Sequence, residues 1–129
     1  MKLRIKGSSL RLRLTQGEIR DLVENGTVAE RVPFASNAAL IYRLRLDHGI
    51  NEITATYHGN LIEILVPERM AREWYGTDLV GLARSQPVEG GGELRIALEK
   101  DFACLAPREG EDESDNFPHP NAAGGSRTC

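Results

Sequence analysis

The sequence predicts a mainly β protein of the α+β class in which one β-β-α-β-β unit occurs twice. Apolar residues recur at alternate positions over residues 10–14 and again over residues 62–66, which is the period of a half-buried strand. Both runs pass directly into a short segment with apolar residues at helical spacing, and these segments stop at Gly26 and Gly76. The repeated order of strand, helix and glycine indicates an internal duplication.

Local signals place the individual elements. Residues 2–6 and 10–14 are expected to form a β-hairpin around a Gly-Ser-Ser turn. The first helix should begin where Thr15 and Glu18 have the spacing of a capping box, and Pro67 suits the first position of the second helix. The remaining strands are expected at residues 27–34, 40–46, 52–57, 61–66 and 94–98, with a further return strand at Val80, the match of Val28.

One constant offset of 52 residues relates the two units through two strands and a turn. The same offset places Trp74 at the position of Leu22 and Val80 at that of Val28. Later residues match at an offset of 54, so we expect two extra residues in the loop that contains residues 90–92, where insertions cost little. The matched strand pairs are Leu3 and Ala55, Ile5 and Tyr57, Leu10 and Ile62, Leu12 and Ile64, and Leu14 and Val66.

The apolar faces of these strands and helices are expected to form one core. Helices this short are marginal on their own, so their burial against the sheets should be what stabilises them. The predicted buried residues are Leu3, Ile5, Leu12, Leu14, Leu22, Val28, Tyr42, Leu44, Ile53, Ile62, Ile64, Trp74, Val80, Ile96 and Leu98.

A chain of 129 residues fits one compact domain. We expect the duplicated domain over residues 1–106, with units at about 1–49 and 50–106, and an acidic tail rich in Pro and Gly over 107–129. No apolar run is long enough to span a bilayer and no signal peptide is evident, so we expect a cytoplasmic protein without a membrane partner. The two cysteines should be reduced thiols.

Charge is unevenly distributed along the chain, whose formal net charge is −3. Residues 1–50 hold nine basic and five acidic residues, residues 51–106 hold five and nine, and residues 107–129 hold two and five. The two units therefore have opposite polarity. This asymmetry could direct a partner to one face, or it could reflect two ordinary solvated surfaces.

The order of hairpin, helix and hairpin resembles the swapped-hairpin barrel of AbrB- and MazE-type regulators. The residues that carry the resemblance are Gly7-Ser8-Ser9-Leu10, Gly59-Asn60-Leu61, Val66-Pro67-Glu68 and Asp78-Leu79-Val80. Those regulators are homodimers with one unit per chain. The resemblance therefore implies a single-chain pseudo-dimeric swapped-hairpin barrel, an arrangement compatible with a monomer. The segment from Glu99 to Leu105, continued by 110–118, also resembles the closing part of a small uncharacterised bacterial family.

Basic residues on the first hairpin are the first candidate site. In the family that the chain resembles, paired N-terminal hairpins present arginines to DNA, and phosphate contacts require such clusters. The matching face of the second unit offers Glu52 and Glu63 but no Lys or Arg, and a solvated sheet face would explain the cluster equally well. The candidate nucleic-acid-binding residues are Lys2, Arg4, Lys6, Arg11 and Arg13.

The tail is the second candidate site. Its composition buries little apolar surface, and antitoxins of the resembling family use an acidic tail to wrap a toxin. Phe102, Leu105 and Phe117 could instead pin the tail onto its own barrel. The candidate partner-binding tail residues are Glu111, Asp112, Glu113, Asp115 and Phe117.

A metal site is the third candidate, and catalysis is the least favoured. Cys104, Asp112, Asp115 and His119 could ligate a metal, although their mixed chemistry and spacing are not those of a structural zinc site. No nucleophile with a nearby base and no phosphate-binding glycine loop is found, so no catalytic residue and no cofactor are expected. The sequence therefore predicts a non-enzymatic regulator or adaptor that binds an unknown protein or DNA, with metal binding as the alternative.

Overall fold

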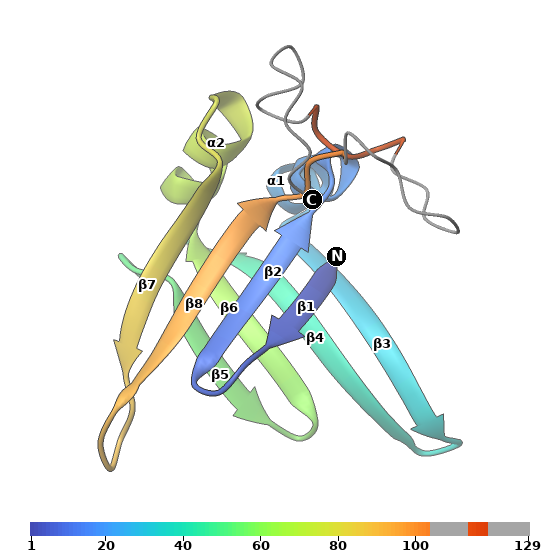
Figure 1. Ribbon diagram of the computed structural model, residues 1–129, viewed down its shortest axis with the longest axis vertical. Coiled ribbons are helices and arrows are strands. Elements are labelled where there is room, and N and C mark those ends of the chain that lie inside the picture. The colour runs from blue at the N-terminus through green and yellow to red at the C-terminus, as the bar shows by residue number, and fades with distance from the viewer. Residues whose placement is uncertain (104–113, 119–129) are drawn as a thin grey trace.

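Figure 1 shows the computed structural model, which describes residues 1–103 and 114–118. The described chain is mainly β with two helices, as the sequence predicts, and each half follows the order β-β-α-β-β. The elements are β1 (Lys2–Ile5), β2 (Ser9–Leu14), α1 (Gln16–Asn25), β3 (Thr27–Ala35), β4 (Ala38–Asp47), β5 (Thr54–His58), β6 (Leu61–Pro67), α2 (Glu68–Gly76), β7 (Gly81–Pro87) and β8 (Glu93–Lys100).

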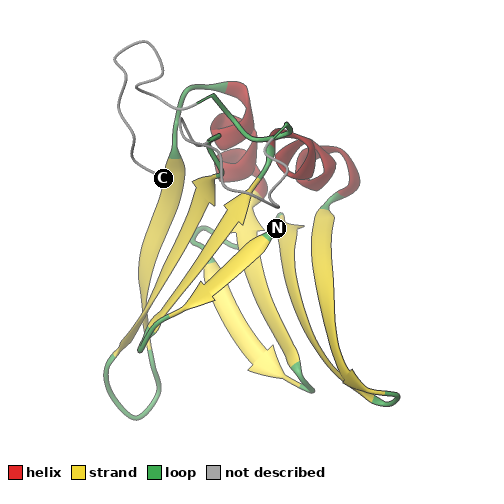
Figure 2. Cartoon of the chain, turned by 45° about the vertical axis from the view of Figure 1, so that its right-hand side comes forward, coloured by secondary structure: helices red, strands yellow, loops and turns green. Residues whose placement is uncertain are grey.

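The strands form two four-stranded sheets, and each sheet combines a hairpin from one half of the chain with a hairpin from the other. The first sheet has the order β1-β2-β8-β7 and the second has the order β3-β4-β6-β5. Strands within a hairpin are antiparallel, whereas the central pairs, β2 with β8 and β4 with β6, are parallel. Both helices lie at one end of the molecule and the hairpin turns lie at the other (Figures 1 and 2).

The two central strand pairs have the same register. Leu12 pairs with Leu98 across β2 and β8, and Ile64 pairs with Leu44 across β6 and β4. Leu12 and Ile64 are 52 positions apart, and Leu44 and Leu98 are 54 positions apart. Exchanging the two halves of the chain therefore maps one pair onto the other, which is the relation that the sequence repeat predicts.

The two added residues of the second half precede β7. Val28 and Leu82 pair with equivalent residues of β4 and β8, so Leu82 is the counterpart of Val28. The expectations that Val80 takes this place and that the insertion lies with residues 90–92 are both wrong. Val80 is 48 % exposed because it lies in the lengthened connection between α2 and β7.

The lengthened connection supplies acceptors for two polar groups of the second half. The indole N–H of Trp74 donates to the carbonyl of Val80 at 3.1 Å, and the ammonium of Lys100 donates to the carbonyl of Thr77 at 2.8 Å. The corresponding positions of the first half are Leu22 and Leu46, which need no such acceptor. A buried donor without a hydrogen-bond partner is costly. The longer connection therefore provides the acceptors that Trp74 and Lys100 need and that the leucines of the first half do not.

The core lies between the sheets and extends to the helices. Trp74 and Leu22 are both fully buried, as expected from their matched positions, and Ile19 and Ala71 one turn earlier are buried as well. Ile5 is 56 % exposed, contrary to prediction, because it lies beside the turn of the first hairpin, beyond the packed part of the core. The buried hydrophobic residues are Leu12, Leu14, Ile19, Leu22, Leu44, Ile53, Ala55, Ile64, Val66, Ala71, Trp74, Ile96 and Leu98, with Leu3, Val28 and Tyr42 partly buried against them.

The helix boundaries follow local capping chemistry. Thr15 and Glu18 form the predicted capping box of α1, and Gly26 ends this helix in the left-handed conformation with φ of 87°. In α2, Pro67 is the cap rather than the first helical residue, and Gly76 is the last helical residue, followed by extended Thr77. The predicted ends of α2 are therefore displaced by one residue.

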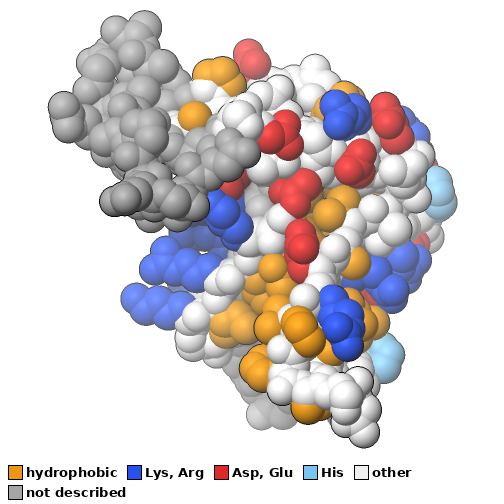
Figure 3. Space-filling view, turned by 90° about the vertical axis from the view of Figure 1, so that its right-hand side faces the viewer, with side chains coloured by type: hydrophobic (Ala, Val, Ile, Leu, Met, Phe, Trp, Pro, Cys, Tyr) orange, Lys and Arg blue, Asp and Glu red, His pale blue; other side chains and the backbone are white. Residues whose placement is uncertain are grey.

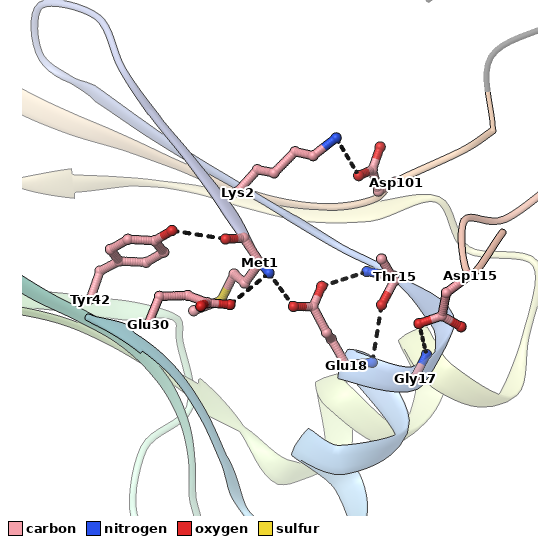
Figure 4. Close-up of polar contacts among 9 residues, drawn as sticks. All are labelled: Met1, Lys2, Thr15, Gly17, Glu18, Glu30, Tyr42, Asp101 and Asp115. Carbon is pink, nitrogen blue, oxygen red and sulfur yellow. Dashed lines mark hydrogen bonds and ion pairs between the residues drawn. The ribbon is translucent and has the colours of Figure 1, made fainter. Parts of the chain in front are cut away.

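Side-chain contacts, rather than backbone pairing, bridge the sheet edges. The side-chain amide of Gln86 on β7 bonds both backbone groups of Ala55 on β5, at 2.8 and 2.9 Å. On the opposite side, the amine of Met1 contacts the carboxylates of Glu18 and Glu30 (Figure 4). Within the described residues, neither sheet closes on itself and no strand pairing joins the two sheets. The expected closed barrel is therefore not formed by backbone hydrogen bonds.

Candidate nucleic-acid interface

The predicted basic residues lie together on the outward face of the first sheet. Arg4 on β1 pairs with Arg11 on β2, and Lys2 pairs with Arg13, so the five side chains form a compact group with Lys6 at the turn. Figure 3 shows Lys and Arg side chains projecting from the outer side of this sheet, at the left of the view. The structure adds a further residue, because Arg95 on β8 pairs with Ser9 on β2.

A shallow groove of about 830 Å³ runs across this face. Five cations from both halves of the chain line it, namely Arg4, Lys6, Arg11, Arg84 and Arg95, and we call it the basic groove. Arg84 is paired with Glu52 at 3.0 Å. Ala83 and Ser85 on β7 and Ala97 on β8 have small side chains, which leave room above the sheet beside the cations. The small residues lining the basic groove are Gly7, Ser8, Ser9, Ala83, Ser85 and Ala97.

Acidic neighbours neutralise the group unequally. Arg11 and Arg13 share one carboxylate, that of Glu99, at 3.3 and 3.6 Å. Lys2 lies 3.2 Å from Asp101. The cations at the other end of the basic groove, Arg4, Lys6 and Arg95, have no ion pair with any residue that the structure describes. Unneutralised charge is therefore concentrated toward the hairpin turns.

On the outward face of the second sheet, the acidic side chain is enclosed by its arginines. Glu63 on β6 occupies the position that corresponds to Arg11, and it is almost fully buried between Arg43 and Arg45 on β4. The Nε atoms of these arginines lie 2.6 and 3.3 Å from the carboxylate. Burial acts to raise the pKa of Glu63, but the hydrogen bonds and charges of Arg45 and Arg43 outweigh it and hold the pKa below its ordinary value.

The two outward faces are therefore not electrostatically equivalent. Each face has one carboxylate shared by two arginines, Glu63 on the second sheet and Glu99 on the first, but Glu63 is the more buried of the two. The first sheet also carries Arg4, Lys6 and Arg95, which have no ion pair with any described residue. The expectation that the face of Glu63 has no Lys or Arg is wrong. Arg43 and Arg45 come from the first half of the chain and reach this face through the pairing of β4 with β6.

Comparison with known proteins identifies a family. Residues 1–121 match a protein family that is described as a family of unknown function, DUF7009. The chain belongs to DUF7009. The match covers both units, the basic groove and most of the tail. Neither the curated proteins nor the solved structures contain a match to the chain.

Part of the DUF7009 tail lies against the duplicated domain. At the start of α1, the backbone N–H of Gln16 donates to the carbonyl of Asp115 at 3.2 Å, and that of Gly17 donates to its carboxylate at 3.3 Å (Figure 4). Phe117 packs edge-to-face on Phe102 with ring centroids 5.7 Å apart. Two of the predicted partner-binding residues thus make contacts within the chain, and the other three, Glu111, Asp112 and Glu113, lie outside the described residues.

The predicted metal ligands are tested only in part. Cys104, Asp112 and His119 lie outside the described residues, and the carboxylate of Asp115 accepts the hydrogen bond from Gly17. In the part of the chain that the structure describes, no group of three or more His, Cys, Asp or Glu side chains is placed to hold a metal ion. Within the same residues, no helix is long and apolar enough to cross a membrane.

Proposed function

We propose that this DUF7009 protein is a non-enzymatic regulator or adaptor that binds DNA through the basic groove. The observation that carries the proposal is the convergence of Arg4, Lys6, Arg11 and Arg95 on one concave surface. Three of these cations have no acidic partner among the described residues. Such unneutralised cations bind the phosphate groups of nucleic acids, because binding releases the counterions condensed on the nucleic acid.

The shape of the basic groove supports phosphate contacts in particular. Ala83, Ser85 and Ala97 keep the surface between the cations low, so a phosphodiester backbone can approach the sheet. Ser85 also brings a hydroxyl group that can donate to phosphate oxygens. An ordinary solvated sheet face would explain the cations but not the groove between them. The expected contacts position a nucleic acid and do not read its sequence.

We also propose that the two halves form the pseudo-dimeric arrangement of AbrB- and MazE-type regulators. The exchange of hairpins between the sheets and the matching registers of the central strand pairs support this proposal. The departure from that pattern is the electrostatic difference between the two faces, so only one of them is proposed to bind DNA.

The tail and the metal site are weaker alternatives. Asp115 and Phe117 are engaged with α1 and Phe102, and a partner protein would have to compete with these contacts. A metal site would require residues outside the described part of the chain. The basic groove needs no rearrangement, and we therefore favour it.

The proposal is tested by charge reversal with a matched control. In the variant that combines Arg4→Glu and Arg95→Glu, affinity for a fluorescently labelled duplex should fall about tenfold or more at moderate salt. Arg69→Glu changes charge at an exposed position on α2, at the other end of the molecule, and should leave affinity within about twofold. Anisotropy titrations measure both. Equal losses in the two variants, or no binding by the natural chain, would exclude the basic groove as a DNA site.

A further inference from the structure

The end of the molecule opposite the helices carries exposed apolar side chains on all four of its hairpins. The most exposed large hydrophobic residues among those described are Phe34, at 74 %, Tyr57, at 67 %, and Ile5, at 56 %. Val88, beside the fourth turn, is 45 % exposed. The four hairpin turns project in the same direction (Figures 1 and 2). We call these four residues the apolar tips.

The apolar tips are related by the internal duplication. Ile5 and Tyr57 occupy matched positions 52 residues apart, and Phe34 and Val88 occupy matched positions 54 residues apart. An apolar cleft of about 320 Å³ opens between the sheets at this end, lined in part by Leu10 and Ile62. Figure 3 shows hydrophobic side chains gathered in the lower half of the view. Exposed apolar side chains at duplicated positions and the apolar cleft thus occur together at one end of the molecule.

Charge around the apolar tips is complementary to an anionic surface. Arg4, Lys6 and Arg95, the cations without ionic partners, lie toward the same end. The β3–β4 turn region, residues 33–40, and the β5–β6 turn region, residues 57–62, contain no acidic residue. The β7–β8 hairpin, in contrast, has acidic residues beside its turn, namely Glu89 and Glu93. Three of the four hairpins thus combine an apolar tip with neutral or basic surroundings.

We propose that the apolar tips dock this protein peripherally on a bilayer surface that contains anionic lipids. The four side chains belong to four separate hairpins, three of them at or near strand ends and Val88 directly after β7. A protein partner would need a separate pocket for each, whereas the fluid interfacial region of a bilayer accommodates isolated apolar side chains wherever they enter. Cations beside the tips then lie at the level of the anionic headgroups.

This inference does not depend on the proposed DNA binding. The expectation of no membrane partner rested on the absence of a spanning segment, which has no bearing on peripheral contact. Phe34 and Tyr57 lie outside the basic groove, so their substitution separates the two activities. Both side chains are mostly exposed, and replacing them should leave the fold intact.

Co-sedimentation of the full chain with vesicles tests the inference. The natural chain should partition onto phosphatidylcholine vesicles that contain phosphatidylglycerol and only weakly onto phosphatidylcholine alone. Phe34→Ser and Tyr57→Ser should each lower the partition coefficient about tenfold. Tyr75→Ser, at the helical end and 45 % exposed, is the matched control and should lower it by less than about twofold.

Charge-neutralising variants provide a second readout. Lys6→Gln should weaken partitioning about fivefold, and Glu89→Gln should strengthen it about fivefold. The inference is overturned if the natural chain does not sediment with anionic vesicles, or if Phe34→Ser and Tyr57→Ser sediment as well as Tyr75→Ser does. A chain that is dimeric in solution, becomes monomeric in Phe34→Ser and ignores vesicles would instead identify a second copy as the occupant.

Discussion

Replacement of Glu63 by glutamine removes the charge that two arginines enclose on the second sheet, while it preserves side-chain volume. A hydrogen bond to a charged group contributes about 1.5–3 kcal/mol when it is well shielded from water. The side chains of Arg43 and Arg45 are 37 and 42 % exposed, however, so solvent screening reduces each pair to about 0.5–1 kcal/mol. Two such pairs predict that Glu63→Gln lowers the free energy of unfolding by about 1–2 kcal/mol at pH 7.

The lowered pKa of Glu63 also predicts how the effect of Glu63→Gln on stability changes with pH. Because the pKa of Glu63 is held below its ordinary value of 4.5 in the folded chain, its contribution is complete above that pH and is lost as the pH falls through the lower folded value. Urea denaturation should therefore show a difference in the free energy of unfolding between the natural chain and Glu63→Gln that is constant well above pH 4.5 and shrinks as the pH falls below 4.5. Glu99→Gln, at a more exposed carboxylate, is the control and should cost about 0.5 kcal/mol or less. A difference between Glu63→Gln and the natural chain that does not change with pH would refute the charge-pair explanation.

Two further predictions concern the helices and the tail. Trp74→Leu, which reproduces the residue of the first half, should lower the free energy of unfolding by about 2–4 kcal/mol in urea titrations followed by circular dichroism, because it opens a cavity and removes the donor to Val80. The neighbouring control Tyr75→Leu should change it by about 0.5 kcal/mol or less, and equal effects would contradict the assigned burial. Gly17→Ala should displace the tail, since the added Cβ would lie 2.9 Å from the carboxylate of Asp115. The N–H of Phe117, bonded to Asp101 at 2.8 Å, should then exchange faster with solvent, as it should in Asp115→Ala; unchanged exchange in both variants would show that these contacts do not hold the tail.

The duplicated fold could be predicted from the sequence because its signals are local and occur twice. Alternating leucines define β2, the capping box defines the start of α1, and the matched position of Leu22 places Trp74 in the core. The position of the two added residues could not be found in this way. The two offsets bracket the insertion, but only the pairing of Leu82 with Leu98 locates it before β7.

The candidate site was predicted only in part because it combines segments that are distant in the sequence. The basic residues of β1 and β2 form a visible local cluster, whereas Arg95 joins them through the parallel pairing of β2 with β8. The same dependence on tertiary pairing conceals the neutralisation of Glu63 by Arg43. Exposure of Ile5 could not be predicted from alternation either, since alternation indicates which face a residue occupies but not where the core ends.

The dependence of DNA affinity on salt tests the central claim most directly. Five cations line the basic groove; Arg84 is paired with Glu52, Arg11 also contacts Glu99, and three have no ionic partner among the described residues, so three to four are expected to contact phosphates. Each phosphate contact contributes about −0.9 to the slope of log K against log salt concentration, so a slope of about −3 to −4 is predicted for the natural chain. In the Arg95→Glu variant the slope should become shallower by about 1. A slope near zero, or one that Arg95→Glu leaves unchanged, would contradict the account.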